Sequence, residues 1–204
     1  MNTRTKMRKI VAQIAETDPR FLPIIEDSKL CDLGIYPPER SHFESLVSSV
    51  ISQQLATAAA RTINERFKSA VGKVTPKNVE SLSDLELRGV GLSAAKTKTI
   101  RGLADAANNK LINFNKLHEE DDDLLYSKLT SLWGIGPWTV DMFMMFQLGR
   151  LDIWPTGDLG VRRGWESIHK LKSEITPKDL ESKGAKFKPH RSVVAWYCWR
   201  ALDN

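Results

Sequence analysis

The stretch Leu132-Trp133-Gly134-Ile135-Gly136-Pro137-Trp138-Thr139-Val140 decides how this sequence is interpreted. Two glycines stand in a short turn, and Pro137 suits the first turn of a helix. Gly134 and Gly136 can adopt positive φ, and without a Cβ they leave room for an anion at the free N–H groups of the helix start. The predicted phosphate-binding residues are Gly134, Ile135, Gly136, Trp138 and Thr139. The alternative is an αα-hairpin that needs glycine only for its turn.

A second segment, Trp154-Pro155-Thr156-Gly157-Asp158, follows the hairpin. Its carboxylate stands just before a helix expected to start at Leu159, so Asp158 could simply be an N-cap. A hairpin that holds a phosphate backbone, followed by a lone carboxylate, is also an arrangement that could act on DNA. Both interpretations of Asp158 stay open at this point.

Composition sets broad limits on the protein. The chain has 204 residues, of which 41% are hydrophobic, enough for a substantial core in one domain or in two closely associated lobes. The net charge of +5 and the pI of about 9.2 suit a polyanionic partner without proving one. Cys31 and Cys198 match no metal spacing or disulfide framework, so we expect both to be reduced and structural.

No run of apolar residues is long enough to span a membrane, and the basic N-terminus lacks the apolar region of a signal peptide. We therefore expect an intracellular protein without a membrane partner. Its compartment would be the cytoplasm (nucleoid) of a prokaryote or the nucleus of a eukaryote.

Helical patterns dominate the chain. Apolar residues at helical spacing predict helices over residues 43–51 and 55–67, with Gln53-Gln54-Leu55 at the junction. Residues typical of helix starts recur along the chain: Thr75-Pro76, Ser83 with Glu86, Ser93, and Thr176-Pro177. No strand-like alternation of useful length occurs, so the predicted fold class is all-α.

Three further stretches have competing interpretations. The acidic run Glu119 to Asp123 is better explained by helix capping than by metal binding. Residues 140–148 are apolar on every side, which predicts a helix buried all round. Lys96, Lys98 and Arg101 follow the Gly89-Val90-Gly91 turn; they could contact phosphate, although the polar face of a surface helix is the more ordinary explanation.

From Ser41 onward, the chain resembles the helix-hairpin-helix DNA glycosylases, and most nearly their alkylation-repair branch, the 3-methyladenine DNA glycosylase II type. The segments that carry this resemblance, in the family's order, are Ser52-Gln53-Gln54-Leu55, Gly89 to Ser93 with Lys96, Leu132 to Val140, Pro155 to Asp158, and Lys188 to Ser192 leading to Trp199.

The resemblance implies a two-lobed helical fold with the active site in the cleft between lobes. One lobe would comprise about residues 41–130, and the other residues 1–40 plus 131–204, including the hairpin and the catalytic aspartate. The implied activity is monofunctional base excision: an alkylated purine, 3-methyladenine or 7-methylguanine, is flipped out and its N-glycosidic bond is hydrolysed to leave an abasic site. Alternatives are another lesion, such as hypoxanthine or ethenoadenine, and a non-catalytic DNA-binding module.

Site residues follow from the same resemblance. Asp158 matches the catalytic aspartate, and Trp138 and Trp199 match aromatic walls around the flipped base; core packing is the alternative for Trp138. Met142 and Leu159 stand at pocket positions where the best-known bacterial relative has tyrosines. Gln54 and Leu55 match the DNA wedge, although Leu55 could instead begin the apolar stripe of the next helix. We expect three other tryptophans in the core: Trp133, Trp165 and Trp196.

Some activities of related enzymes are not expected here. Trp138 stands where lyase-capable members carry the lysine for Schiff-base chemistry. Cys198 stands alone where other members have four cysteines for an iron–sulfur cluster. We expect no metal centre and no cofactor; the one ion that the hairpin carbonyls could hold is a monovalent cation. The expected partner is double-stranded DNA with a damaged base, bound by a monomer.

Overall fold

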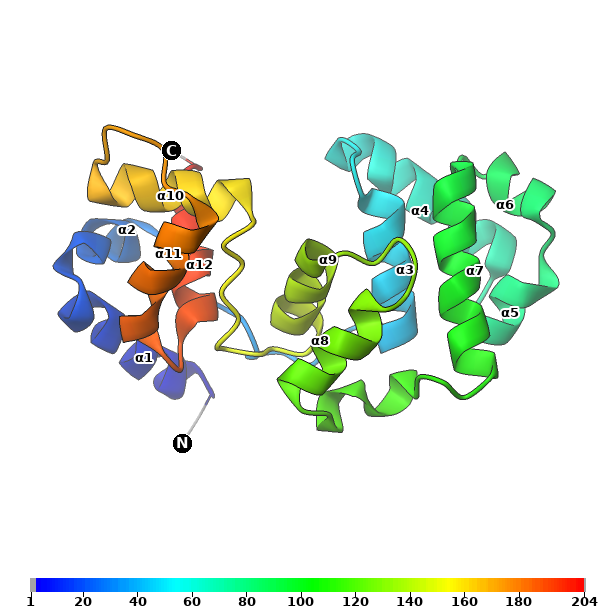
Figure 1. The fold of residues 1–204 in the computed structure, drawn as a ribbon, viewed down its shortest axis with the longest axis horizontal. Coiled ribbons are helices and arrows are strands. Elements are labelled where there is room, and N and C mark those ends of the chain that lie inside the picture. Colours follow the sequence, from blue (N-terminus) through cyan, green and yellow to red (C-terminus); the bar gives the residue numbers. More distant parts are fainter. Residues whose placement is uncertain (1–2, 204) are drawn as a thin grey trace. The chain divides into compact units, whose positions relative to one another are not determined.

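The computed structural model describes residues 3–203, and no strand occurs in this part of the chain (Figure 1). The predicted all-α fold class is therefore confirmed. The chain divides into two compact units. One comprises Pro38–Phe143, and the other combines Met1–Pro37 with Met144–Asn204.

The unit Pro38–Phe143 is built around α3. Its helices are α3 (His42–Ser52), α4 (Thr57–Val71), α5 (Pro76–Ser81), α6 (Asp84–Gly89), α7 (Ala94–Asn108), the 3-10 helix η2 (Phe114–Glu119), α8 (Asp122–Thr130) and α9 (Pro137–Met142). α3 packs against α4, α7, η2 and α9. Its apolar stripe, Leu46, Val47, Val50 and Ile51, is completely buried and supplies the centre of the core.

Local signals start these helices where the sequence predicts. The side chains of Thr75, Ser83, Ser93 and Thr176 each accept a hydrogen bond from a backbone N–H three residues later, and Ser83 with Glu86 forms a complete capping box. Asp121 caps α8, as the capping interpretation of the acidic run requires.

The other unit contains α1 (Thr3–Thr17), the 3-10 helix η1 (Pro19–Phe21), α2 (Leu22–Asp27), the π-helix η3 (Phe143–Gln147, which starts at the boundary), α10 (Leu159–His169), α11 (Pro177–Gly184), the 3-10 helix η4 (Ala185–Phe187) and α12 (Arg191–Arg200). Its core is aromatic. Phe21 packs edge-on against Trp165 and Phe187, with ring centroids 5.8 and 5.7 Å apart. Trp165 and Trp196 are buried, which confirms their predicted core role.

Both cysteines are buried and free, as expected for structural thiols. Burial raises the pKa of the Cys31 thiol to about 12 and also raises that of Cys198. α10 and α12 meet backbone to backbone beside Cys198, because a Cβ at Gly164 would overlap the Cys198 carbonyl.

Two expectations need correction. The hairpin, residues 131–143, belongs with residues 38–130 and not with the second unit, because α9 packs on both α8 and α3. Residues 140–148 are not a helix buried all round. The π-helix turns Phe146 outward, so that 56% of its surface is exposed, while Phe143, Met144 and Met145 stay buried.

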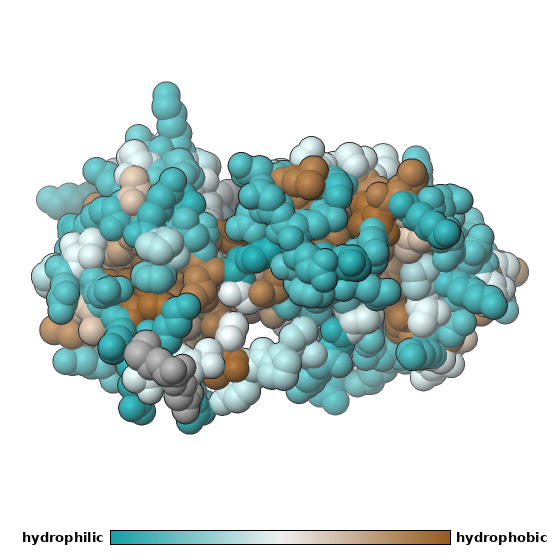
Figure 2. All heavy atoms as spheres, turned by 90° about the horizontal axis from the view of Figure 1, so that it is seen from below, coloured by the Kyte–Doolittle hydropathy of each residue, from teal (hydrophilic) through white to brown (hydrophobic). Residues whose placement is uncertain are grey.

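The surface carries both hydrophilic and apolar side chains. On the face shown in Figure 2, hydrophilic side chains cover most of each unit and apolar ones form separate patches. Within residues 3–203, no helix is long and apolar enough to cross a membrane.

Asp18, between α1 and η1, is the most buried carboxylate with charged partners. Its side chain is 2% exposed and accepts hydrogen bonds from Arg20 (2.7 Å), Lys186 (2.9 Å) and His169 Nε2 (3.1 Å). Burial alone would raise the pKa of Asp18, but these hydrogen bonds outweigh it and hold the pKa well below its usual range.

This depressed pKa predicts acid-sensitive stability. The contribution of Asp18 is complete above about pH 4, the pKa of an unfolded Asp, and is lost as the pH falls toward the lower folded-state pKa. We expect Asp18→Asn to lower the unfolding free energy at pH 7 by roughly 2 kcal/mol, and the gap to the wild type to narrow below pH 4. Urea unfolding from pH 7 to 3 measures this difference.

The matched control is Asp105→Asn, which changes an exposed carboxylate on α7. It should leave the stability at pH 7 within about 0.5 kcal/mol of the wild type. A gap between wild type and Asp18→Asn that stays constant down to pH 3 would contradict the linkage.

Candidate active site

The two glycines of the hairpin between α8 and α9 differ in backbone conformation and in the space around them. Gly134 has φ +81°, and a Cβ there would overlap the Thr99 side chain. Gly136 has φ −92°, so it does not use the positive φ that glycine permits. A Cβ at Gly136 would meet no protein atom within 4 Å. The protein itself therefore requires glycine at position 134 but not at position 136.

Internal hydrogen bonds tie the hairpin to the end of α3. Gln53 Nε2 donates to the Gly134 carbonyl (3.3 Å) and to Thr139 Oγ1 (3.1 Å). Lys96 Nζ donates to the carbonyls of Ile51 (2.7 Å) and Gln53 (2.8 Å), so it caps the C-terminus of α3. Burial lowers the pKa of Lys96. Lys96 therefore stabilises the C-terminal end of α3. Its position on a polar helix face did not predict this role.

Arg101 is likewise engaged inside the unit. It pairs with Asp84 at 3.0 Å and donates to the carbonyls of Val79, Glu80 and Leu82. It therefore joins α7 to the end of α5, to the loop after it and to the start of α6.

The predicted wedge lies in the α3–α4 connection. Gln54 has φ +57°, an uncommon conformation for a residue with a side chain. Leu55 is 37% exposed and lies before α4, which begins at Thr57. The alternative that Leu55 starts the core stripe of α4 is therefore wrong, and its apolar side chain projects from a constrained turn.

Trp138 and Met142 are one helical turn apart on α9, and Trp138 is 47% exposed. The core interpretation of Trp138 therefore fails. Both residues line a small cavity of about 210 Å³ with Ser52, Thr139 and four polar residues that the sequence reasoning missed: Arg40, Ser45, Ser48 and Ser49. The signal for the serines was their helical spacing on α3, opposite its buried stripe.

The prediction that Trp133 packs in the core is wrong. This side chain is 54% exposed at the hairpin turn, and Lys98 Nζ lies 4.3 Å from the centre of its ring. The turn that starts at Gly134 directs the preceding side chain outward. An exposed aromatic ring and an exposed cation thus flank the glycines.

Asp158 lies in the other unit and caps α10. Its Oδ1 accepts hydrogen bonds from the Val161 N–H (2.8 Å) and from the Trp199 indole Nε1–H (2.9 Å). The N-cap interpretation of Asp158 is therefore confirmed. Asp158 and Trp199, separated by 41 residues in the chain, are brought into direct contact.

The loop that carries Asp158 is anchored to the start of α12. Arg191 binds both carboxylate oxygens of Asp152, at 2.8 and 3.1 Å. Ser192 Oγ accepts from the Ile153 N–H (2.8 Å), and Trp154 Nε1 donates to the Leu180 carbonyl (3.0 Å). The Arg191-Ser192 segment therefore positions the loop.

Trp199 has a second aromatic neighbour and a tight fit. Phe146 stacks on it with ring centroids 5.7 Å apart. A Cβ at Gly160 would lie 2.8 Å from Trp199 Cδ1, so Gly160 leaves room for the indole. Sequence reasoning missed Phe146 and Gly160. No local sequence pattern predicts the π-helix that carries Phe146 or the contact of Gly160 with Trp199. Leu159, next to Asp158, is 56% exposed.

The candidate residues divide between the units. Gln54, Leu55, Trp138, Met142 and the hairpin belong to Pro38–Phe143, whereas Asp158, Leu159 and Trp199 belong to the other unit. Within residues 3–203, no group of three or more His, Cys, Asp or Glu side chains is arranged to hold a metal ion.

We expect substitutions at the two hairpin glycines to change the unfolding free energy by different amounts. Gly134→Ala combines positive φ with overlap on Thr99, and should lower the unfolding free energy by roughly 2 kcal/mol or more. Gly136→Ala has neither problem and should stay within about 0.5 kcal/mol of the wild type. Urea denaturation of the two variants side by side measures the difference. Equal losses of stability would contradict the distinct roles.

The sequence of this chain is similar to those of known DNA repair proteins. The family model for the HhH-GPD superfamily base excision DNA repair proteins matches residues 47–190. A curated relative, DNA-3-methyladenine glycosylase 1 of Schizosaccharomyces pombe, is 33% identical over 177 residues, which are 82% of this chain and 78% of the relative.

Solved structures agree with the sequence matches. A DNA-3-methyladenine glycosidase from Bacillus halodurans superposes with a TM-score of 0.82 at 34% identity, covering 98% of this chain and 88% of that one. The S. pombe 3-methyladenine DNA glycosylase in complex with abasic DNA gives a TM-score of 0.80 at 29% identity, covering 95% of each chain. With the family model spanning most of the sequence and the hairpin lying inside it, this chain belongs to the HhH-GPD superfamily of base excision DNA repair proteins.

Proposed function

We propose that this protein is a monofunctional DNA glycosylase that flips an alkylated purine out of duplex DNA and hydrolyses its N-glycosidic bond. The product is an abasic site. The proposed substrates are 3-methyladenine first and 7-methylguanine next. Support comes from relatives named for 3-methyladenine excision, one of them in complex with abasic DNA. The observation that carries the proposal is the loop-anchored Asp158 carboxylate in contact with Trp199.

The main requirement of this reaction is a negative charge on the enzyme near the sugar. When the C–N bond breaks, the base leaves with the electron pair and loses its positive charge, so no general acid has to protonate it. The sugar becomes oxocarbenium-like, and water adds to its anomeric carbon and releases a proton. At about 4 Å and an effective dielectric near 20, a carboxylate stabilises such a cation by roughly 4 kcal/mol.

Capping and catalysis are compatible roles for Asp158. The helix N–H and the Trp199 indole hold the carboxylate in one orientation through Oδ1, while its negative charge is shared by both oxygens. A fixed anion spends no reorganisation energy when the sugar cation forms. In this proposal Trp199 is both a wall for the base and a positioning residue for Asp158.

The aromatic residues suit a cationic base. The indole faces of Trp138 and Trp199 would attract an alkylated purine, and Met142 and Leu159 would add apolar surface. Tryptophan at position 138 supplies no amine, so Schiff-base lyase chemistry at this position is not proposed. Hypoxanthine and ethenoadenine, which are uncharged, would gain less from these walls.

The hairpin and the α3–α4 turn would hold the duplex. Open space at Gly136 and the start of α9 fit the close approach of a phosphate, with contacts from Gly134, Ile135, Trp138 and Thr139. Leu55 would fill the gap left by the flipped base, with Gln54 beside it. We propose that the enzyme does so as a monomer.

The proposed reaction uses no cofactor. A monovalent cation at the hairpin carbonyls would compete with existing hydrogen bonds. The carbonyl of Leu132 accepts from Ile135, that of Gly134 from Gln53, and that of Gly136 from Thr139 and Val140.

The experiment that tests the function is Asp158→Asn on a duplex carrying one alkylated purine. The asparagine Oδ1 can still accept both hydrogen bonds, so folding and lesion binding should survive. Removal of the charge should slow single-turnover base release by roughly two to three orders of magnitude. Chromatographic detection of free base measures the rate, with thermal unfolding and DNA binding on the same preparation.

Two results would count against this assignment. Near-wild-type release by a folded Asp158→Asn protein would mean that Asp158 is only a cap. Wild-type protein that binds DNA but releases no base from any lesion would favour the non-catalytic helix-hairpin-helix module. A panel including hypoxanthine and ethenoadenine duplexes separates the lesion alternatives.

Gly136→Val tests the proposed phosphate contact of the hairpin. Since nothing in the protein occupies the space beside Gly136, folding should tolerate the side chain while a phosphate should not. We expect binding to damaged and undamaged duplexes to weaken equally, by roughly tenfold, in fluorescence anisotropy. The control is Gly102→Val, another open position, in the middle of α7. A loss confined to damaged DNA would instead place Gly136 in the base pocket.

A further inference from the structure

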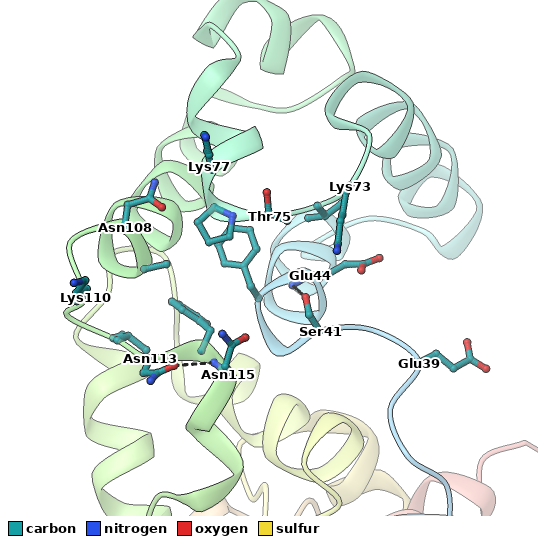
Figure 3. A pocket seen from close by; sticks show the side chains of 16 residues that line it. Glu39, Ser41, Glu44, Lys73, Thr75, Lys77, Asn108, Lys110, Asn113 and Asn115 are labelled. Carbon is teal, nitrogen blue, oxygen red and sulfur yellow. Dashed lines mark hydrogen bonds between the residues drawn. The ribbon is translucent and has the colours of Figure 1, made fainter.

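A large cavity of about 910 Å³ lies in the unit Pro38–Phe143, and none of its lining residues is among the site residues assigned above (Figure 3). It is bounded by the start of α3, the loop between α4 and α5, and the segment that follows α7. Its size falls within the range of ligand pockets. Nothing in the proposed base-excision reaction uses it.

The floor of this cavity is apolar. Phe43 and Phe114 meet edge to face, with ring centroids 5.5 Å apart and planes at 89°. Val74 and Ile112 extend the same surface, and each of the four residues is at most 7% exposed. A ligand would therefore gain from placing an apolar group here.

The rim carries an excess of positive charge. Lys73, Lys77 and Lys110 stand at separate points around the floor (Figure 3). Within residues 3–203, none of the three has a carboxylate within ion-pair distance. Of the two acidic residues that line the cavity, Glu44 is already neutralised by Lys68 at 2.7 Å, which leaves Glu39.

Three asparagines, Asn108, Asn113 and Asn115, complete the rim. Their amides can both donate and accept hydrogen bonds, as the peptide group does. Asn113 uses its Oδ1 to accept from the Asn115 N–H (3.2 Å), and Asn108 donates to Glu80 (2.6 Å). The Nδ2 of Asn113 and the side chain of Asn115 form no hydrogen bond within the described part of the chain.

The cavity lies at the opposite end of α3 from the hairpin. Ser41 and Glu44 reach it from the start of this helix, whereas Gln53 contacts the hairpin at its end. Eleven helical residues separate the two ends by about 16 Å. α7 runs the other way, with Lys96 at the hairpin end and Asn108 at the cavity.

We propose that this cavity docks a short acidic peptide segment of a partner protein, with one apolar side chain on the Phe43–Phe114 floor and carboxylates on Lys73, Lys77 and Lys110. The apolar floor favours a ligand with an apolar group, and the lysines favour one that also carries negative charge. A DNA backbone would satisfy the lysines but offers no apolar group to the floor. The cavity shares no lining residue with the hairpin, so we expect peptide docking to leave base release unchanged.

The test uses a fluorescently labelled acidic peptide with one central phenylalanine and the intact protein. We expect saturable binding in fluorescence anisotropy, and at least a roughly tenfold loss in the triple variant Lys73→Glu, Lys77→Glu, Lys110→Glu. The matched control reverses three exposed lysines of the other unit, Lys172→Glu, Lys178→Glu and Lys183→Glu, and should bind nearly as the wild type does.

Two further measurements make the proposal falsifiable. Replacing the peptide phenylalanine by serine should weaken binding severalfold if the floor is used; an unchanged affinity would overturn the proposal in favour of unspecific charge attraction. Binding of lesion duplex and base release should be the same for both triple variants. A triple cavity variant that loses DNA binding while the wild type ignores the peptide would reassign the lysines to DNA and overturn docking.

Discussion

The backbone contact between α10 and α12 is the constraint on which the unit that carries Asp158 depends. Gly164 lets α10 touch the carbonyl of Cys198, and Gly160, one turn earlier, leaves room for the next side chain of α12, Trp199. This spacing brings the Trp199 indole within hydrogen-bond distance of Asp158 at the start of α10. The burial of Cys198, which keeps its thiol unreactive, is a consequence of the same close packing.

The unit that carries the hairpin is ordered by two half-buried polar side chains, Lys96 and Gln53. Lys96 satisfies the last carbonyls of α3, and Gln53 then reaches the hairpin at Gly134 and Thr139. These bonds hold the α3–α4 turn and the hairpin in one arrangement. Preorganisation of this kind lowers the entropic cost of binding. Residues that look like phosphate contacts can thus support the site from within.

The two hairpin glycines illustrate how structural and functional demands are separated. Gly134 is required by its own backbone conformation and by Thr99, whatever the protein binds. Gly136 has no such internal reason, and the space beside it stays open for a ligand. Exposure of Trp133 and Trp138 on either side of the glycines adds aromatic surface where the duplex is proposed to lie.

The sequence by itself determined the all-α fold, the positions of helix starts and the hairpin, because caps, turns and apolar periodicity act between residues a few positions apart. It also brought Asp158, Trp199, Gln54 and Leu55 forward as candidates, through the resemblance. Only the tertiary structure decided that Trp133 is exposed, that the hairpin packs with residues 38–130, and that Phe146 and Gly160 shape the surroundings of Trp199. Exposure and helix contacts depend on which distant segment covers a side chain, and no local pattern encodes that partner.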